Sequence, residues 1–333
     1  MFGLQDIKER TIFQINSLDK LKFHIEMGNI VISDKESGEV KTKLCCTKVF
    51  ALVIIGGYTI TTPTLEKCSQ FGIQLVCVKT NFKPFFVFGN FAESNYLLRY
   101  RQYHVENALE IATVIQLNKM ENQIQNLKLI RKKSDLQSQR IERCQSLLTQ
   151  LNRGLQLSEL MGIEGNVAKN YFTAYFEEFE WKGRKPRAKQ DYVNSILDIG
   201  YTYLFNIVET FSRLFGFDIY MGFCHQTWYR RKSLICDLVE PFRVIIDAKV
   251  VKCIHLNQFQ KEHFIEKHGQ YFLKYEYQTQ YSKIFLEELV EHKIEIFTYI
   301  REFYRAFMGQ KSLENFPIYN YCEGIIEYVG GKL

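Results

Sequence analysis

The chain contains 333 residues, of which 46% are hydrophobic and 15% aromatic, so it can bury the core of one large domain or of two smaller ones. This composition excludes a disordered chain, and the formal net charge of +6 permits a nucleic-acid partner without requiring one. The longest apolar run, residues 49–57, is far too short to cross a bilayer, so we expect no membrane segment.

The nine cysteines include no C-x-x-C pair, and most of them lie inside apolar segments. This pattern indicates buried thiols in a reducing compartment rather than disulfides or a zinc site. The first ten residues are charged almost at once and contain no signal-peptide run. We therefore expect a cytoplasmic protein in which all nine thiols are reduced and none binds a metal.

Residues 1–90 are predicted to form a β-rich N-terminal domain. Short β-branched or alternating runs predict strands at residues 11–16, 21–26, 29–33 and 39–44. The run 49–55 is continuously apolar, as expected of a strand that is covered on both faces. Two threonines and a proline at 61–63 predict a short helix that ends at Gly72, after which 73–78 returns to strand. Because this half contains no cluster of catalytic residue types, we interpret it as a scaffold or dimerisation surface.

Residues 91–333 are predicted to form a larger, all-helical domain, which makes the fold class α+β. Apolar residues recur there at helical spacing, as Ala108, Ile111 and Ile115 do. The basic residues between positions 119 and 133 have two interpretations. They contact a phosphate backbone, or they form the solvated face that a charged run on a helix usually is.

Glu164 is the first candidate functional residue along the chain, and it lies between Gly162 and Gly165. Glycine permits the close approach of a ligand or of another backbone, and packing explains a carboxylate at this place poorly. The alternative is a glutamate at the entry of a helix, where the helix dipole favours a negative charge.

Two segments are dense in cations and are candidate DNA-binding elements. The first is a Gly/Pro loop at residues 181–189, and the second follows His225 and combines basic with aromatic residues. Like charges crowded in a loop repel each other, so an anionic partner is expected. The candidate DNA-binding residues are Lys182, Arg184, Lys185, Arg187, Trp228, Arg230, Arg231 and Lys232. Trp228 either stacks on a splayed base or packs in the core.

The stretch from 216 to 243 carries the densest set of functional residue types. His225 precedes two carboxylates, Asp237 and Glu240, which are three residues apart, and Arg243 follows after three more. On one helix these three would share a face, with two anionic oxygen donors beside a fixed cation. Such a face suits a hard divalent metal next to a phosphate.

The start of that helix has two interpretations. Ser233 is well placed to cap a helix over residues 234–240. Alternatively, Asp237 and Glu240 form a capping box, in which Asp237 is the cap and Glu240 reaches back. In that case neither carboxylate needs a metal.

Four segments, in this order, resemble the CRISPR-associated protein one family, the integrase of CRISPR spacer acquisition. They are MGIEGNVAKNYF around Glu164, DYVNSILDIGYTYLF, GFDIYMGFCH ending at His225, and SLICDLVEPFR, which contains Asp237, Glu240 and Arg243. The N-terminal half is similar in layout, including TTPTLEKCSQFGIQLVCV and RYRQY. No single motif is decisive, but four in the same order make a strong resemblance over nearly the whole chain.

The resemblance implies a metal held by Glu164, His225 and Glu240, with Asp237 close by. Some members carry aspartate at the position of Glu240, which leaves open whether it or Asp237 binds the ion directly. Two carboxylates and one imidazole suit Mg²⁺ or Mn²⁺ better than a structural zinc. Arg243 is our candidate for the nearest phosphate cation. Asp198 stands where the family commonly has asparagine, which speaks against a hydrogen-bonding role at that position.

The resemblance also implies an activity and a set of partners. The expected protein is a metal-dependent DNA endonuclease or integrase that inserts foreign DNA fragments into a CRISPR array. In this reaction a 3′-hydroxyl attacks a phosphodiester, and water in its place makes the same site a nuclease. The expected partners are DNA (prespacer and CRISPR repeat), a second copy paired through the β-domains, and the small second CRISPR adaptation protein.

Two other functions compete with this interpretation. The first is a non-catalytic nucleic-acid-binding subunit, in which Asp237 and Glu240 only cap a helix. The second is a histidine–aspartate phosphohydrolase, which is the weaker alternative because the chain has no adjacent His-Asp pair.

Overall fold

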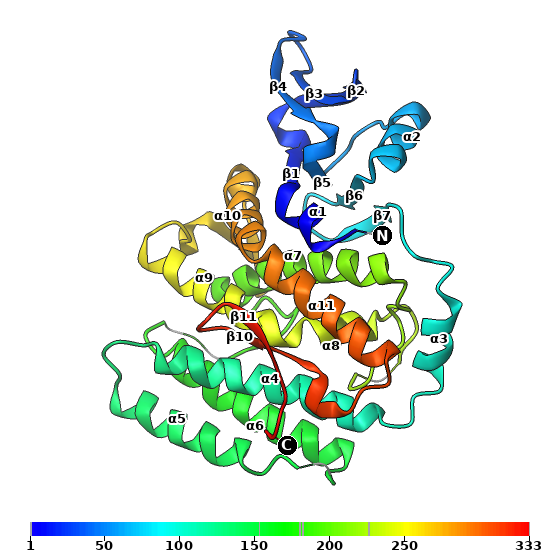
Figure 1. The fold of residues 1–333 in the computed structure, drawn as a ribbon. Helices are drawn as coiled ribbons and strands as arrows, with labels where there is room; N and C mark the ends of the chain where they lie inside the picture. The colour runs from blue at the N-terminus through cyan, green and yellow to red at the C-terminus, as the bar shows by residue number, and fades with distance from the viewer. Residues whose placement is uncertain (1, 153, 180, 182, 226, 333) are drawn as a thin grey trace.

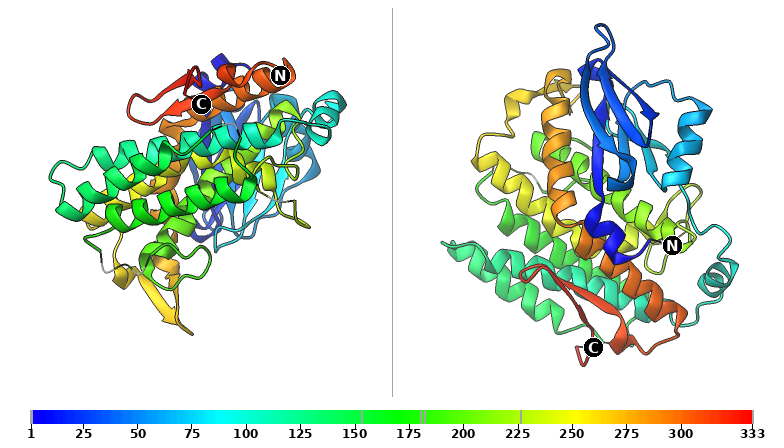
Figure 2. Two further views of the ribbon diagram at one scale, coloured as in Figure 1. Left: turned by 90° about the horizontal axis from the view of Figure 1, so that it is seen from below. Right: turned by 45° about the horizontal axis from the view of Figure 1, so that its top comes forward.

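The computed structural model describes residues 2–152, 154–179, 181, 183–225 and 227–332. A β-rich region lies at one end of the molecule, and a larger helical body lies below it in Figure 1. The predicted α+β class is therefore confirmed. The three helices between residues 108 and 175 lie side by side in both views of Figure 2, and Figure 1 shows them at the end of the molecule away from the β-rich region.

The β-rich region contains two sheets. The first has the order β1-β5-β6-β7, in which β1, β5 and β6 are parallel and β7 is antiparallel, and the second is an antiparallel β2-β3-β4 meander. The strands are β1 (Thr11–Asn16), β2 (Leu21–Glu26), β3 (Asn29–Asp34), β4 (Val40–Cys45), β5 (Val49–Ile55), β6 (Gln74–Val78) and β7 (Pro84–Phe88). The six predicted strands are present to within a residue at each end, and β7 adds an unpredicted edge.

Strand β5 explains why this region holds together. All of its residues are buried, and they alternate between two cores. Leu52 and Ile54 pack with β2 and β3, whereas Val53 and Ile55 belong to the large core that continues into the helical body. Helix α2 (Thr62–Phe71) connects β5 to β6 and ends at Gly72 in the left-handed conformation, as predicted.

The helical body consists of long helices with short connections. Its α-helices are α3 (Tyr96–Tyr103), α4 (Ala108–Lys128), α5 (Asp135–Leu148), α6 (Leu157–Tyr175), α7 (Tyr192–Phe215), α8 (Ser233–Leu238), α9 (Arg243–His255), α10 (Gln278–Glu291) and α11 (Lys293–Met308). Two hairpins interrupt it, β8 (Phe264–Lys267) with β9 (Gln270–Leu273) and β10 (Pro317–Asn320) with β11 (Ile325–Tyr328). The body is therefore mainly helical rather than all-helical.

The two regions meet along β1. The side chains of Gln14 and Asn16 donate to the hydroxyls of Ser282 (2.7 Å) and Thr279 (3.0 Å) on α10. The N-terminal helix α1 (Leu4–Glu9), which was not predicted from the sequence, packs on α11. The β-rich region is therefore joined to the helical body by its own first strand.

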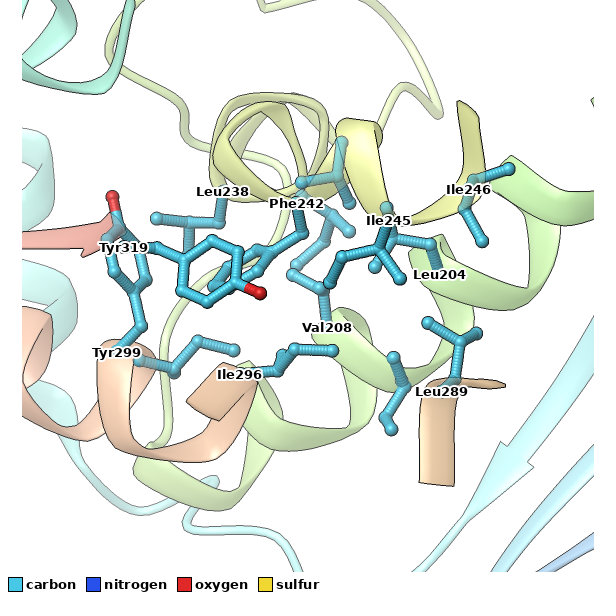
Figure 3. Close-up of a cluster of buried hydrophobic side chains, with 14 of the residues drawn as sticks. Leu204, Val208, Leu238, Phe242, Ile245, Ile246, Leu289, Ile296, Tyr299 and Tyr319 are labelled. Atoms are coloured by element: carbon cyan, nitrogen blue, oxygen red, sulfur yellow. The ribbon is translucent and has the colours of Figure 1, made fainter. Parts of the chain in front are cut away.

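A core behind the candidate site fixes the chain between α8 and α9. In Figure 3, Leu238 and Phe242 lie among side chains from α7, α10 and α11. The ring of Phe242 meets the ring of Tyr299 edge-on, with centroids 5.2 Å apart. Because Leu238 and Phe242 are both fully buried, the residues between them cannot shift independently of this core.

Two further features concern the cysteines and the lengths of the helices. All nine thiols are free, and six of them are buried. In the described part of the chain, no helix combines the length and the apolar character needed to cross a membrane.

Replacing Gly200 of α7 by alanine should lower the free energy of unfolding by about 1–3 kcal/mol, because overpacking forces neighbouring side chains aside. A Cβ at this position would lie 2.5 Å from Ile246 Cγ2 and 2.7 Å from Phe285 Cε1. The matched control is Gly165→Ala in α6, where a Cβ meets no other described group within 4 Å. Alanine favours a helix over glycine, so the control should gain about 0.5–1 kcal/mol. Urea unfolding measures both, and equal effects would contradict the packing described here.

Candidate active site

The predicted helix over residues 234–240 is interrupted before its end. Helix α8 stops at Leu238, a 3₁₀ turn η3 (Glu240–Phe242) follows, and α9 starts at Arg243. Pro241 is the cause, because proline has no N–H and its ring clashes with the carbonyl four residues earlier. Ser233 is the first helical residue rather than the cap, which is Lys232. Asp237, Glu240 and Arg243 therefore do not share one helix face.

Asp237 organises the loop that carries His225. Its buried carboxylate accepts from the backbone N–H groups of Phe223 (2.6 Å), Cys224 (3.1 Å) and His225 (3.0 Å). The capping-box interpretation is therefore wrong, since these bonds tie Asp237 to a preceding loop. A Cβ at Gly222 would lie 2.6 Å from Asp237 Oδ2, so this close approach requires glycine.

Asp237 also fixes the ring of His225. Nδ1 of His225 lies 2.6 Å from Asp237 Oδ1, and because a carboxylate only accepts, Nδ1 carries the proton. The lone pair of a neutral ring is then on Nε2. A carboxylate that orients a histidine in this way is the usual arrangement behind a metal-ligating imidazole.

Glu164 and Glu240 meet through a lysine that was predicted either to contact DNA or to face solvent. Lys119 lies in the middle of α4, is only 8% exposed, and places its Nζ 2.5 Å from Glu164 Oε1 and 2.6 Å from Glu240 Oε2. The two carboxylate oxygens are therefore at most about 5 Å apart, because both contact the same nitrogen. Although burial opposes it, the charges of Glu240 and Glu164 raise the pKa of the Lys119 ammonium. Lys119 thus neither faces solvent nor is free to contact DNA.

Glu240 has a second cationic partner. Arg243 Nε and Nη2 donate to its two carboxylate oxygens, both at 2.9 Å, and the guanidinium lies 4.7 Å from the centre of the Tyr201 ring. Burial alone would favour the neutral acid, but Arg243 and then Lys119 lower the pKa of Glu240 to about 2. Glu240 is therefore ionised at neutral pH despite being buried.

Cys224 links the His225 loop to the two helices that carry Lys119 and Glu164. Its Sγ lies 3.5 Å from Gln116 Nε2 on α4 and 3.4 Å from Met161 Sδ on α6. Gln116 and Met161 are each three residues before Lys119 and Glu164, so these contacts lie one helical turn away from Lys119 and Glu164. The loop that carries His225 is thereby held against α4 and α6.

The predicted ligand residues are of types that fit a hard divalent ion, although their donor atoms do not surround a single point. Among the described residues, one group of three has potential ligand atoms that all lie within 4.8 Å of one another. This group consists of Cys224, His225 and Asp237. Burial and the charge of Asp237 raise the pKa of Cys224 to about 12, so its thiol stays protonated and is a poor ligand. The predicted ligands Glu164, His225 and Glu240 do not form such a group, but two carboxylates and an imidazole are the donor types that suit Mg²⁺ or Mn²⁺.

A buried network of tyrosine and aspartate side chains packs against this site. Asp247 of α9 accepts from the hydroxyls of Tyr171 (2.9 Å) and Tyr201, and Tyr171 accepts from Asn126 Nδ2 (2.9 Å). This network was not predicted from the sequence. Complete burial raises the pKa of Asp247 to about 6, against the opposing effect of the two hydroxyls.

Some of the candidate DNA-binding cations are already paired. Arg184 donates to Asp198 (2.6 Å) and lies against Tyr201, and Lys232 donates to the buried Glu209 (2.5 Å). Asp198 therefore does form hydrogen bonds, contrary to the expectation from its difference from the family, because Arg184 and the backbone N–H of Arg187 (3.0 Å) donate to its carboxylate. Lys182 lies outside the described residues.

The other candidates face solvent. Lys185, Arg187, Arg230 and Arg231 are exposed, and Trp228 is 74% exposed, so the core-packing alternative for Trp228 is wrong. Trp228 and Arg230 line a shallow cavity of about 420 Å³ together with Tyr103, Tyr220 and Tyr229. An exposed mixture of cations and aromatic rings is typical of surfaces that bind single-stranded nucleic acid.

Comparisons with known proteins identify the family of this chain. A family described as CRISPR associated protein Cas1 matches residues 19–289, so the chain belongs to the Cas1 family. A relative described as CRISPR-associated endonuclease Cas1 1 from Thermodesulfovibrio yellowstonii is 28% identical over 271 residues, which are 77% of this chain and 85% of the relative. A Cas1 3 endonuclease from Thermus thermophilus is 28% identical over 73% of this chain and 74% of its own length.

Solved structures show the same fold at low sequence identity. A Cas1 protein from Thermotoga maritima has a TM-score of 0.71 at 20% identity, covering 91% of this chain and 98% of that chain. A casposase bound to integration product has a TM-score of 0.70 at 20% identity, covering 91% and 92% of the two chains. A chain of a Cas6-RT-Cas1–Cas2 complex has a TM-score of 0.76 at 18% identity, and this chain covers only 36% of it.

Asp247 should make the stability of the protein depend on pH between about 4 and 7. Because burial raises its pKa, the folded state retains a proton that the unfolded chain has released, and this stabilisation is lost as the pH rises through about 6. Asp247→Asn removes the titration, so its free energy of unfolding relative to wild type should rise by up to about 3 kcal/mol across this range.

Urea unfolding at pH 4.5, 5.5, 6.5 and 7.5 measures this difference. The control is Asp135→Asn at an exposed carboxylate, whose effect should remain within about 0.5 kcal/mol at every pH. A constant offset between Asp247→Asn and wild type would show that Asp247 does not titrate in this range.

Proposed function

We propose that this Cas1 protein is a divalent-metal-dependent DNA endonuclease and integrase of CRISPR adaptation, which joins foreign DNA fragments to a CRISPR array. The observation that supports this most directly is the convergence of Glu164 and Glu240, which are far apart in sequence but contact the same Lys119 ammonium, while Asp237 orients the ring of His225. The names of the relatives, Cas1 endonucleases and a casposase, agree with this chemistry.

Glu164, His225 and Glu240 would hold the ion, which is Mg²⁺ or Mn²⁺. When bound, such an ion polarises the scissile phosphate and stabilises the charge that builds on it. Of the two neighbouring carboxylates, Glu240 is the better direct ligand. Asp237 is fully engaged, since it accepts three backbone N–H groups and the ring of His225. Asp237 is then the positioning residue that directs Nε2 of His225 toward the ion.

Arg243 has two roles in this proposal. Its Nε and Nη2 hold Glu240, which keeps that carboxylate ionised and oriented. A guanidinium has five N–H donors, so three remain for a phosphate oxygen. The nucleophile is the 3′-hydroxyl of the incoming DNA end, or water in the nuclease reaction. No side chain of the protein needs to form a covalent intermediate.

The expected partners correspond to different surfaces. The exposed cations at 185, 187, 230 and 231, with Trp228, would bind the DNA of the prespacer and of the CRISPR repeat.

Strand β7 is the edge of its sheet and exposes Phe85 (60%) and Phe86 (48%), and such an exposed apolar edge is suited to pairing with another protein surface. We assign residues 1–90 to homodimer formation and residues 91–333 to catalysis, in the cytoplasm. Solved relatives include Cas1–Cas2 complexes and a Cas1–DNA complex, which supports a complex with the small second adaptation protein.

Glu164→Gln, His225→Ala and Glu240→Gln should each reduce Mn²⁺-dependent strand transfer by at least about a hundredfold, since loss of even an outer partner of a metal ligand costs 10–100-fold. Folding and most of the DNA affinity should survive, because binding depends on cations elsewhere. The control is Glu121→Gln, a carboxylate on α4 that pairs with Lys332 at the surface. A gel assay with labelled DNA ends measures joining. Retained activity in a variant would show that its residue is not a required ligand, and the absence of joining by the wild type would favour the non-catalytic alternative.

Arg230→Ala and Arg231→Ala should weaken binding to DNA of every sequence. The slope of log affinity against log salt concentration should fall by about 0.9 for each duplex phosphate that the variant protein no longer neutralises. Lys232→Ala is the comparison, because this neighbour is paired with Glu209 and should affect stability rather than the salt slope. Fluorescence anisotropy between 50 and 200 mM salt gives the slopes. Unchanged affinity and slope for Arg230→Ala and Arg231→Ala would make these arginines ordinary surface charges.

A further inference from the structure

Lys119 lies where a metal ion would neutralise the carboxylates of the site. Its side chain is buried on α4, and its ammonium contacts Glu164 and Glu240 at the same time. Two carboxylates this close together and shielded from water repel each other strongly, so a cation between them stabilises the pair. The protein thus needs a positive charge at this place whenever no ion is bound.

We propose that Lys119 is a built-in counterion, whose ammonium holds Glu164 and Glu240 in place until a divalent ion displaces it. This inference rests on the proposed function, because it assumes that these carboxylates are metal ligands. The affinity of the site for the divalent ion is then set by competition with a side chain of the same protein. Lys119 is then a positioning residue rather than a ligand.

A count of charges in the cluster supports this assignment. Glu164 and Glu240 contribute two negative charges, and Lys119 and Arg243 contribute two positive charges, so the four groups together are neutral. Arg243 already neutralises Glu240 through two hydrogen bonds, which leaves Lys119 as the balance for Glu164. A divalent cation that enters this neutral cluster meets repulsion unless the ammonium withdraws or a phosphate arrives with it.

The charge count predicts that DNA and metal bind cooperatively. A phosphodiester brings the negative charge that the cluster lacks once the ion is present, so Mn²⁺ should bind the wild-type protein more tightly when DNA is bound. Without the lysine charge the cluster is already negative, and it should attract the ion without DNA. Loss of Lys119 should therefore weaken the coupling between the two ligands.

The test uses the full-length protein and its variants Lys119→Met and Lys119→Gln. Calorimetric titration with Mn²⁺, without DNA, should give a Kd at least about tenfold lower in both variants than in wild type, equivalent to about 1.4 kcal/mol. In EDTA the melting temperature of the variants should be below that of wild type, and saturating Mn²⁺ should recover most of the difference. Glutamine still donates to one carboxylate, so this variant keeps the test valid if the methionine variant folds poorly.

Lys128→Met is the matched control, because Lys128 is exposed on the same helix and should leave the Mn²⁺ affinity unchanged. If wild type binds Mn²⁺ and both Lys119 variants bind it equally or more weakly, the lysine does not compete with the ion and the inference is wrong. If neither wild type nor the variants bind Mn²⁺ even when DNA is present, the proposed metal-dependent function fails instead. The two failures are thus distinguished by the wild-type titration.

Discussion

Glu240 is the group around which the charged side chains of this molecule are arranged. It lies in a 3₁₀ turn, buried, between Lys119 of α4 and Arg243 at the start of α9. A buried ion pair is weak evidence for stability, because the cost of removing two charges from water often exceeds their attraction. A cluster of this kind that reaches a second carboxylate is better explained by a functional role than by a gain in stability. Perturbed carboxylates with specific charged partners are typical of functional sites.

Helix α4 brings these parts together because its inward face is polar. Asn122 donates to the carbonyl of Pro241 in the 3₁₀ turn (2.9 Å), and Asn118 exchanges two hydrogen bonds with Tyr319 of β10 (2.8 and 2.9 Å). Asn122 also accepts from the N–H of Tyr321 (3.1 Å). Buried polar groups that are paired in this way specify one arrangement, since an alternative packing would leave them unsatisfied. The position of Lys119 therefore follows from hydrogen bonds made by its neighbours on the same helix.

The parts that could be predicted from the sequence are those with a local cause. Alternation and turn residues located β1 to β6, and the continuous apolar run of β5 indicated its burial on both faces. The resemblance supplied Glu164, His225 and Glu240, and no local pattern would have joined them. Pro241 alone predicts the break before α9. The expectation that Asp237, Glu240 and Arg243 share one helix face does not take this proline into account. Lys119 was misjudged because a lysine on a helix is usually solvated, and only its partners, distant in sequence, reveal otherwise.

A different signal would have identified α4. Six polar residues of this helix are buried, and each of them lies three or four residues from another of the set: Gln116, Asn118, Lys119, Asn122, Gln123 and Asn126. Polar residues at the spacing of a core face indicate a buried network rather than a surface. The pairing of Arg184 and Lys232 with acidic residues could not be foreseen, since Asp198 and Glu209 lie on a long helix whose orientation the sequence does not give.

The bonds between α4 and the β10 hairpin have a consequence for how the protein is made. Asn118 pairs with Tyr319, which is 201 residues later in the chain. At a synthesis rate of about 5–20 residues per second, a ribosome needs roughly 10–40 s to supply this partner. During this time the helix that carries Lys119 lacks the hydrogen-bond partners that the β10 hairpin supplies to its buried polar residues. A chain that ends before Tyr319 would lack these bonds, so the helix that carries Lys119 reaches its final arrangement only after the C-terminal hairpin has been made.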